Sequence, residues 1–480
     1  MIRFLEFANQ ALFYYYLACN FIYLTMLIVA FKGSASHQRR LQSVSLDSIK
    51  RSPLSPPISI LTPAHNEQES ISVAVQNLLD LDYPELEVIV VNDGSTDQTF
   101  QTLDERFVLR PIRAVYIQQV KTAAVKGMYR SDRDPRLLVL DKEAAGSKAD
   151  AVNAGLNAAT SPYVCVVDAD SVLERDALMR IMIPVLTDPD RVVSAGGIVR
   201  VLNGAETRGG RVSRIRLPRK SIEVIQVVEY LRAFLIGREA WARANMLMII
   251  SGAFGVFRTD LVRAVGGYRA QAIGEDFDLV ARLHRFLRDQ QADYKIEFVP
   301  DPVCWTEVPS DIRSLGRQRA RWQKGLLDVL WPNRDMLFRL RYGRIGVLAL
   351  PYLWAFELLA PVIEVGGILT ILAAACLNAL SREFLVQFLF FGYAFATIIS
   401  IGSVLQEEMT YKRYNEWRDV ARLLTHCFFE HFPYRQINML WRLQGLWQYL
   451  RGDREWKPLK RRGLDAANTD TKAPSAAPAS

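Results

Sequence analysis

Cysteine is scarce in this chain of 480 residues, which has only five. They lie far apart, at Cys19, Cys165, Cys304, Cys376 and Cys427. None forms a CxxC pair and no Cys and His spacing suits zinc, so the sequence predicts neither a disulfide framework nor a structural zinc site. Charged residues make up 23% of the chain and hydrophobic residues 50%, which excludes a disordered or collagen-like protein.

A strong excess of either charge is also missing. Lys and Arg total 59 against 51 for Asp and Glu, which gives a formal net charge of +8. Much of the excess lies in residues 204–220, at Arg208, Arg211, Arg214, Arg216, Arg219 and Lys220. This segment has no interleaved aromatic residues, so a loop facing anionic lipid explains it more simply than a nucleic-acid interface. No nucleic-acid partner is expected.

Three long stretches have little or no charge. The first is the 25 residues between positions 6 and 32, and the third is residues 384–405. The second, residues 345–377, contains only two charged residues, Glu357 and Glu364. Because about 20 apolar residues suffice to cross a bilayer, the sequence predicts three membrane spans.

The second stretch is too long for one perpendicular crossing at about 1.5 Å per residue, so its start, with Pro351, is expected to lie along the membrane surface. Glu357 and Glu364 are seven residues apart and therefore share a helix face. Two interpretations stay open for them: they line a water-filled channel, or Glu357 merely meets water at the interface.

After Leu405 the chain mixes charged and aromatic residues, a pattern typical of helices lying in the membrane surface, with a break at Pro433. Basic residues between 451 and 462 place that end in the cytoplasm. We therefore expect an N-terminal anchor and linker at residues 1–56, interfacial helices with two spans at 331–463, and a disordered tail at 464–480. The protein is predicted to be a multi-pass protein of the cell (plasma or inner) membrane, with its middle part cytoplasmic.

Residues 57–330 alternate between strand-like and helix-like patterns. Apolar runs predict strands at 58–64, 86–93, 137–141, 163–170, 192–199 and 296–300, and helices are expected at 67–81, from 96 onwards, and at 147–159. This alternation predicts an α/β domain with a mostly parallel sheet, which binds ligands at the carboxyl ends of its strands.

Carboxylates and a lysine stand at those strand ends. Asp93 ends a predicted strand, where it accepts a hydrogen bond from a base or ribose or else caps the next helix. Asp168 and Asp170 close another strand, and two carboxylates at this spacing suit a divalent cation with phosphate oxygens better than a capped turn. Lys148 opens a predicted helix and suits a diphosphate, although a plain surface lysine fits nearly as well.

Two later motifs carry further chemistry. Asp276, in the sequence GED (274–276), lies near the start of an apolar helix, where it serves as a general base or as a helix cap. In QRARW, Gln318, Arg321 and Trp322 combine an amide, a guanidinium that pairs with diphosphate, and an indole platform for a sugar ring. A membrane-interface anchor is the alternative interpretation of this second motif.

Six motifs follow one another along the chain: TPAHNE (62–67), VNDGS (91–95), GSKADAVNAG (146–155), DAD (168–170), GED (274–276) and QRARW (318–322). In this order they resemble the membrane-embedded family 2 glycosyltransferases, which include cellulose, chitin, hyaluronan and poly-N-acetylglucosamine synthases. The resemblance covers about residues 57–325. It implies that residues 57–330 are a cytoplasmic α/β domain of the GT-A fold, with a UDP-sugar as donor and Mg²⁺ or Mn²⁺ as cofactor.

The resemblance also implies roles for single residues. Thr62, Pro63, Glu67 and Asp93 would hold the uridine, Lys148 and Asp168 the nucleotide-sugar, and Asp170 the metal. Asp276 would be the general base, while Glu275, Gln318, Arg321 and Trp322 would hold the diphosphate and the acceptor end. Gly274 stands where many members have Thr, and Ser147 precedes Lys148 where the family has Gly, but the carboxylates and the lysine are retained.

The implied reaction is inverting transfer from UDP-GlcNAc or UDP-Glc to a growing β-linked extracellular polysaccharide. Besides the donor, the expected partners are the polysaccharide or a lipid acceptor, membrane lipids, and a second copy of the chain or accessory export proteins. Transfer of one sugar to a lipid, as in ceramide glucosyltransferases, stays open, because only product length separates it from polymerisation. A non-enzymatic scaffold or nucleotide sensor is disfavoured, since every expected carboxylate is present.

Overall fold

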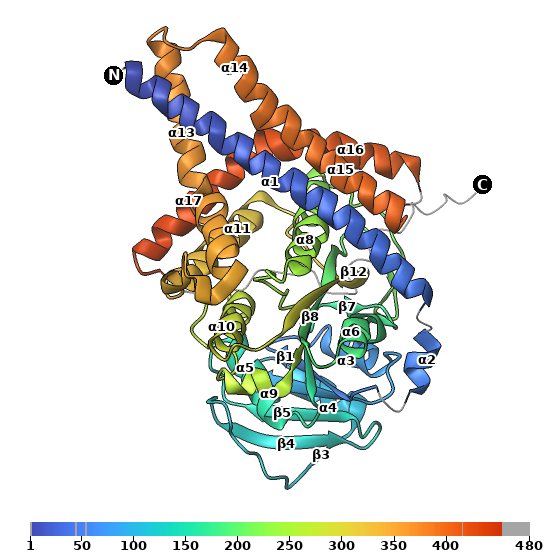
Figure 1. Ribbon diagram of the computed structural model, residues 1–480. Coiled ribbons are helices and arrows are strands. Elements are labelled where there is room, and N and C mark those ends of the chain that lie inside the picture. Colours follow the sequence, from blue (N-terminus) through green and yellow to red (C-terminus); the bar gives the residue numbers. More distant parts are fainter. Residues whose placement is uncertain (1, 44–45, 53–54, 415, 454–480) are drawn as a thin grey trace, which may run out of the picture.

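The computed structural model describes residues 2–43, 46–52, 55–414 and 416–453. A domain built around a β-sheet lies at one end of the molecule, and long helices from both ends of the chain cross its top and project away from it (Figure 1). The tail predicted to be disordered, residues 464–480, lies outside the described residues.

Ten strands form one sheet in the order β3-β4-β5-β2-β1-β6-β11-β8-β12-β7, and two form a separate hairpin. The strands are β1 (Ile58–Ala64), β2 (Leu86–Asp93), β3 (Leu109–Pro111), β4 (Val125–Ser131), β5 (Leu137–Lys142), β6 (Tyr163–Val167), β7 (Val172–Leu173), β8 (Val192–Val201), β9 (Glu206–Arg208), β10 (Arg211–Arg214), β11 (Phe254–Arg258) and β12 (Lys295–Thr306). The α/β class predicted from the sequence is therefore confirmed.

The prediction of a mostly parallel sheet is wrong, because the sheet is mixed. β1 pairs in parallel with β2 and β6, β2 with β5, and β8 with β12. β11, which the apolar pattern did not predict, is antiparallel to both β6 and β8. At one edge β4 is antiparallel to β3 and β5, and at the other β7 is antiparallel to β12.

The helices of the sheet domain are α3 (Ile71–Leu79), α4 (Thr99–Phe107), α5 (Lys148–Ala158), α6 (Ala177–Thr187), α7 (Ser221–Tyr230), α8 (Arg238–Arg243), α9 (Thr259–Ala264), α10 (Glu275–Asp289) and α11 (Ile312–Leu330). The remaining helices are α1 (Ile2–Ser43), α2 (Leu46–Arg51), α12 (Leu350–Tyr352), α13 (Ala360–Cys376), α14 (Arg382–Leu389), α15 (Phe395–Thr410), α16 (Trp417–Phe429) and α17 (Arg435–Leu450). A π-helical turn, η1 (Leu231–Gly237), joins α7 to α8.

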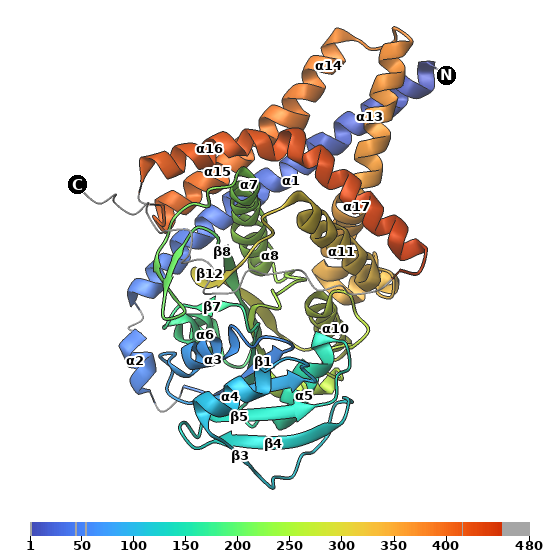
Figure 2. The same cartoon turned by 180° about the vertical axis from the view of Figure 1, so that it is seen from behind.

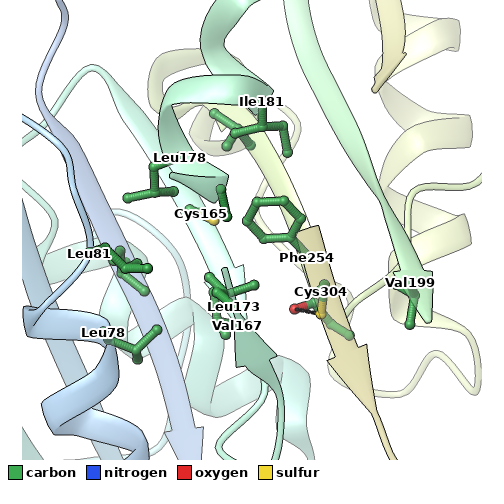
Figure 3. Packing of buried hydrophobic residues seen from close by; sticks show 14 of the residues in the cluster. Leu78, Leu81, Cys165, Val167, Leu173, Leu178, Ile181, Val199, Phe254 and Cys304 are labelled. Atoms are coloured by element: carbon green, nitrogen blue, oxygen red, sulfur yellow. Dashed lines mark hydrogen bonds between the residues drawn. The ribbon is translucent and has the colours of Figure 1, made fainter. Parts of the chain in front are cut away.

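Alternation along the central strands produces two hydrophobic cores, one on each face of the sheet. Ile58 and Ile60 of β1 belong to the core beneath α3 and α6, whereas Leu61 faces the other core with α5 and α10. In the first core, Cys165 and Phe254 lie close to residues of α6 (Figure 3). All five cysteines are free thiols, and all but Cys376 are buried.

Among the described residues, two helices are long and apolar enough to cross a membrane, Ile2–Arg39 and Arg382–Thr410. A third span results if the bent pair Ile345–Leu358 and Ala360–Cys376 is one crossing. The two parts of this pair meet at 46°, with the break near Leu359. That the start of this stretch, with Pro351, lies along the membrane surface stays a prediction. Two or three spans are therefore compatible with the structure.

The helices α16 and α17 cross the base of the projecting helices, beside α15 and α11 (Figure 2). The helical path between them breaks at Phe432, which has non-helical backbone angles, directly before Pro433. A residue that precedes proline is disfavoured in the helical region, which explains the break predicted there.

The basic segment at 204–220 contains the β9–β10 hairpin, and several of its arginines pair with carboxylates of the protein. Arg211 lies 2.7 Å from Asp80, and Arg216 lies 3.1 Å from Glu206. These pairs reduce the positive charge that the segment offers to anionic lipid.

Buried polar contacts fix the projecting helices to the sheet. Arg200, at the end of β8, forms two 2.7 Å contacts with the carboxylate of Glu407 in α15, and both side chains are at most 5% exposed. His37 of α1 contacts Asp301 in β12 at 2.8 Å. The helices that are long enough to span a membrane and the sheet domain therefore form one packed unit.

Replacing Glu407 by Ala is expected to destabilise the protein by about 3–5 kcal/mol, because Arg200 would be left buried without its counter-charge. The measurement is the unfolding transition of the purified protein in detergent. An Arg200→Met/Glu407→Leu double variant removes both charges and is expected to lose much less stability. Equal losses in the single and double variants would contradict this account of the pair.

Candidate active site

The carboxyl ends of the parallel strands β1, β2, β5 and β6 bring most of the expected site residues to one edge of the sheet. Asp93 is the last residue of β2, and Asp168 follows directly after β6. Lys148 is the first residue of α5, which follows β5. The placement of these groups at strand ends agrees with the sequence prediction.

Lys148 is the centre of a charged cluster. Its ammonium forms an ion pair with Asp168, lies 3.8 Å from a carboxylate oxygen of Glu275, and donates a 3.1 Å hydrogen bond to the carbonyl of Gly252. Burial alone would lower the pKa of Lys148, but the Asp168 and Glu275 carboxylates outweigh burial and raise it. Burial raises the pKa of Glu275, and Lys148 opposes this only in part. The cluster thus combines one cation with several carboxylates in a partly buried place.

Asp276 lies beside this cluster in the first turn of α10 and stays partly exposed. Its Oδ2 accepts a 3.2 Å hydrogen bond from the backbone N–H of Gly252, the residue whose carbonyl binds Lys148. Gly274 takes the N-cap position, but Oδ1 of Asp276 accepts a 2.8 Å hydrogen bond from the backbone N–H of Phe277 in the first turn. Asp276 thus caps this turn in part, while its Oδ2 is turned toward Gly252 and the charged cluster.

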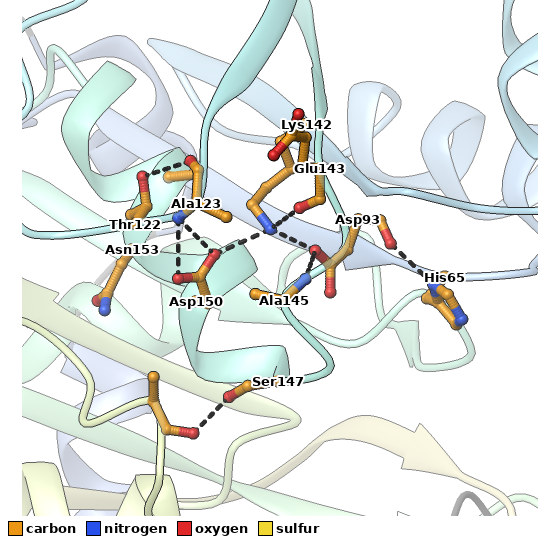
Figure 4. A network of polar contacts seen from close by, with 12 residues as sticks. His65, Asp93, Thr122, Ala123, Lys142, Glu143, Ala145, Ser147, Asp150 and Asn153 are labelled. Carbon is orange, nitrogen blue, oxygen red and sulfur yellow. Dashed lines mark hydrogen bonds and ion pairs between the residues drawn. The ribbon is translucent and has the colours of Figure 1, made fainter.

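Asp93 belongs to a second network, around Lys142 at the end of β5 (Figure 4). The fully buried ammonium of Lys142 contacts the carboxylates of Asp93 and Asp150, the latter at 2.9 Å. The next helix begins at Thr99 and is preceded by Gln98, so Asp93 is not its cap. Lys142 and Asp150 were missed by the sequence analysis, because nothing in a lone lysine at a strand end predicts which carboxylates it meets.

Gly94 allows the turn after Asp93 to lie close to the β5–α5 loop. Its φ of +57° is strained for other residues, and a Cβ there would stand 2.6 Å from the backbone nitrogen of Ala144. The glycine of the VNDGS motif thus brings the Asp93 and Lys142 loops together.

The other residues expected to hold uridine lie at the end of β1 and just after it. Thr62 is fully buried, and its hydroxyl has no hydrogen-bond partner among the described residues. Pro63 pairs in register with Val91 of β2. The backbone N–H of Glu67 donates a 2.8 Å hydrogen bond to Thr99, which ties the TPAHNE loop to the start of α4.

The QRARW residues lie on α11, which packs against the GED loop. A Cβ on Gly325 would stand 3.3 Å from the backbone nitrogen of Gly274, so glycine permits this close approach of two backbones. Trp322 is 40% exposed, and Gln318 and Arg321 are partly exposed. The structure thus brings α11 close to the GED loop. Among the described residues, however, no contact joins the side chain of Arg321 to the Lys148 cluster.

Arg319, the first of the two arginines in the same motif, is the one that is held in place. It is 2% exposed and lies 2.6 Å from Glu229 of α7, while its guanidinium stacks over the Trp322 ring at 4.1 Å. This stacking fixes the plane of the indole. Sequence reasoning singled out Arg321 and missed the contribution of Arg319.

Asp170 is 8% exposed and lies two residues beyond Asp168, after β6. No cluster of three or more His, Cys, Asp or Glu side chains suited to a metal occurs within residues 2–453, apart from the short gaps in the description. One or two carboxylates are nevertheless a donor set that fits Mg²⁺, because it commonly takes its remaining ligands from phosphates and water.

Arg238 adds a cation that the sequence did not single out. It follows the π-helical turn η1, is 7% exposed, and stacks over Phe234 at 4.0 Å, with Nη1 lacking a hydrogen-bond partner among the described residues. Burial lowers the pKa of Arg238 to about 10, and the charge of Asp276 partly opposes this.

The mixed α/β sheet, with carboxylates and a lysine at its strand ends and joined to apolar helices, is the arrangement expected of a glycosyltransferase of the GT-A class. Residues 59–261 match the family model for glycosyl transferase family 2, and residues 163–401 match that for glycosyl transferase family group 2. Together the two matches span residues 59–401 and assign glycosyltransferase family 2 domains to this chain, as its six motifs predicted.

Curated relatives include poly-beta-1,6-N-acetyl-D-glucosamine synthases. The protein of Staphylococcus epidermidis is 28% identical over 307 residues, which cover 64% of this chain and 61% of that protein. The protein of Staphylococcus aureus (strain COL) is 27% identical over 310 residues, which cover 63% of each. The chain thus spans about three fifths of the length of these relatives.

Solved structures with a similar fold include a mannosyltransferase of Pyrobaculum calidifontis in complex with GDP-Man and Mn²⁺. It has 21% sequence identity and a TM-score of 0.47, and the match covers 85% of this chain and 99% of that one. TarS 1–349 of S. aureus in complex with UDP-GlcNAc has 15% identity and a TM-score of 0.38, with 79% of this chain and 92% of that one covered.

Proposed function

We propose that this glycosyltransferase moves a sugar from UDP-GlcNAc or UDP-Glc, with inversion, to a growing β-linked extracellular polysaccharide. The observation that carries the proposal is the cluster of Lys148, Asp168, Glu275 and Asp276, which lies at the strand ends beside Asp93. The polysaccharide synthases among the relatives support the product class.

In this proposal the uridine is held by Thr62, Pro63, Glu67 and Asp93. The buried hydroxyl of Thr62, which has no partner among the described residues, is supplied with one when a nucleoside binds. Lys148 and Asp168 hold the diphosphate and the sugar of the donor, because a partly exposed ammonium at the start of helix α5 attracts phosphate oxygens.

Mg²⁺ or Mn²⁺ is the proposed cofactor, held by Asp170 together with the donor phosphates. When bound, such an ion stabilises negative charge on the departing diphosphate. The carboxylate pair at Asp168 and Asp170 provides oxygen ligands of the kind that these ions prefer.

Asp276 acts as the general base. Its Oδ2 is held by the Gly252 N–H, and the partly exposed carboxylate is open to an acceptor hydroxyl. The hydroxyl attacks the anomeric carbon opposite the departing UDP, transfers its proton to Asp276, and leaves a β-linkage when the donor is α-linked. Arg321 and Gln318 bind the leaving diphosphate, while Glu275 and Trp322 hold the acceptor end.

A polar cavity of about 110 Å³ favours a polysaccharide as acceptor. It lies among residues of α1, α13, α15 and α17, and both acidic residues of the second apolar stretch line it. Glu364 lies 2.7 Å from Arg435, and Glu357 lies 3.4 Å from Arg442. Intramembrane carboxylates in such pairs are typical of a transport path.

A hydrogen bond links the lining of the cavity to α11, the helix that carries the proposed acceptor-side residues. Arg442 donates a 2.7 Å hydrogen bond to Gln323, one residue after Trp322. A second copy of the chain or export proteins would widen the path in the proposed membrane assembly, with the sheet domain in the cytoplasm.

Replacing Trp322 by Ala is expected to raise the KM for an oligosaccharide acceptor by about tenfold or more, with a smaller change in kcat, because the sugar loses its stacking platform. The assay is steady-state transfer to acceptors of defined length. Trp331→Ala is the matched control, because Trp331 is also exposed and also stacks with an arginine, Arg334, at the end of α11. A KM for Trp322→Ala equal to that of the control would contradict the platform role.

The experiment that tests the proposed reaction is UDP release by the purified protein in lipid, measured with UDP-GlcNAc, UDP-Glc and GDP-Man. Release from one UDP-sugar that stops on metal chelation is expected. Preference for GDP-Man, or no release from any donor, would contradict it. Transfer of a single sugar to extracted lipid would instead support the second candidate, a lipid glycosyltransferase.

A further inference from the structure

Lys142 is a fully buried lysine that the proposed reaction does not use. Its ammonium has three N–H donors, and three acceptors surround it: the carboxylate of Asp93, that of Asp150 at 2.9 Å, and the carbonyl of Glu143 at 2.8 Å. Figure 4 shows this arrangement. Since every donor is used and the side chain is 0% exposed, Lys142 has no group left to bind a substrate directly.

Lys142 and Ala145 both bind the same carboxylate oxygen of Asp93. The ammonium of Lys142 and the backbone N–H of Ala145, at 3.3 Å, both bind Oδ1 of that carboxylate. The second oxygen, Oδ2, is bound by neither of them. Asp93 itself is 6% exposed, so its carboxylate is held in a nearly closed place at the end of β2.

Asp150 holds Lys142 from the other side. Its two carboxylate oxygens accept hydrogen bonds of 3.2 and 3.1 Å from the backbone N–H of Ala123. The network therefore ties β2, the loop before β4, the end of β5 and the start of α5 to one ammonium group. A lysine fixed by so many backbone-anchored partners has a single orientation.

We propose that Lys142 is a positioning residue that makes the site select uracil over cytosine. By binding Oδ1, it turns Oδ2 of Asp93 toward the base as a fixed acceptor. Uracil offers an N–H at position 3, whereas cytosine offers only a lone pair there, and a carboxylate can accept hydrogen bonds but not donate them. This inference rests on the proposed function, in which Asp93 binds the base of a UDP-sugar.

A purely structural role for Lys142 makes a different prediction. If the network only stabilised the loops, its loss would weaken the binding of UDP and CDP by the same factor, because the two nucleotides share their ribose and diphosphate contacts. If Lys142 positions Asp93, its loss removes a contact that only uracil makes. The ratio of the dissociation constants for CDP and UDP separates the two, since a general loosening of the site leaves that ratio unchanged.

The test is calorimetric titration of the full chain in lipid nanodiscs with UDP and with CDP, in the presence of Mg²⁺. The wild type is expected to bind UDP at least about tenfold more tightly than CDP, the effect of one hydrogen bond to a charged group. In Lys142→Met the ratio is expected to fall to within about threefold of one, mainly through weaker UDP binding. Asp150→Asn keeps an oxygen acceptor for Lys142 and Ala123, so it is expected to keep the UDP preference.

The lone Lys142→Met change leaves two carboxylates without their shared cation. If that variant does not fold, Lys142→Met/Asp150→Asn replaces it, because the double change removes one positive and one negative charge. A folded Lys142 variant with the wild-type ratio would overturn the inference alone. A wild type that binds neither nucleotide would overturn the proposed UDP-sugar function as well, so the two failures are distinguishable.

Discussion

Asp276→Asn is expected to lower kcat by about 10²–10⁴-fold while the UDP-sugar still binds with nearly normal affinity. The amide cannot take the proton of the attacking hydroxyl, and general bases contribute rate factors of this size. Asp276 accepts backbone hydrogen bonds from Phe277 at 2.8 Å and from Gly252 at 3.2 Å, and Asn keeps an oxygen for one of them, so the unfolding transition of the variant is measured as a check on its fold. The measurements are sugar transfer at saturating donor and the dissociation constant of the donor.

Asp289→Asn is the matched control for this variant. Asp289 is the last residue of the same helix and pairs at the surface with Arg341, 2.8 Å away. It is expected to leave kcat unchanged. Normal turnover by a folded Asp276→Asn protein would show that another group takes the proton.

Asp170→Asn is expected to remove most of the metal-dependent part of donor binding, about a 100-fold loss at fixed metal concentration, because a metal at the diphosphate contributes several kcal/mol. The donor affinity of the variant is measured with Mn²⁺ and after chelation. Wild-type affinity should fall sharply on chelation, whereas the affinity of the variant should change little.

The control for Asp170→Asn is Asp176→Asn, at a carboxylate six residues further on that pairs with Arg180 at 2.6 Å, outside the site. It should keep the full response to metal. If Asp170→Asn also kept that response, the metal would have to be held by other residues.

The strands that end at a candidate site residue were predicted from the sequence, because an apolar run followed by a carboxylate is a local pattern. A buried strand followed by Asp, as in β2 and β6, needs no knowledge of distant residues. β11 escaped prediction because Gly255 interrupts its short apolar run and its partners, β6 and β8, are remote in sequence. The same holds for the antiparallel edge at β4, which lies in a segment with a mixed polar pattern.

The partners of the site residues were beyond prediction for a related reason. Periodicity reports which face of an element is buried, but not which remote group it meets. Lys142 and Asp93 are 49 residues apart, and Arg200 and Glu407 are 207 apart. Likewise, the motif QRARW predicted the kinds of functional group on α11. It did not predict that Arg319 pairs with Glu229 and stacks on Trp322, because these contacts depend on tertiary packing. The roles of Asp276, Asp170 and the uridine-binding residues remain predictions.

The most direct test of polysaccharide synthesis is to size the products made from radiolabelled UDP-sugars. The purified chain in lipid is incubated with each donor and Mg²⁺ or Mn²⁺, with Asp276→Asn protein as the blank. Long chains built from one UDP-sugar, sensitive to a β-specific glycosidase and absent from the blank, are the expected result. Products of a single sugar attached to lipid, or α-linked chains, would contradict it.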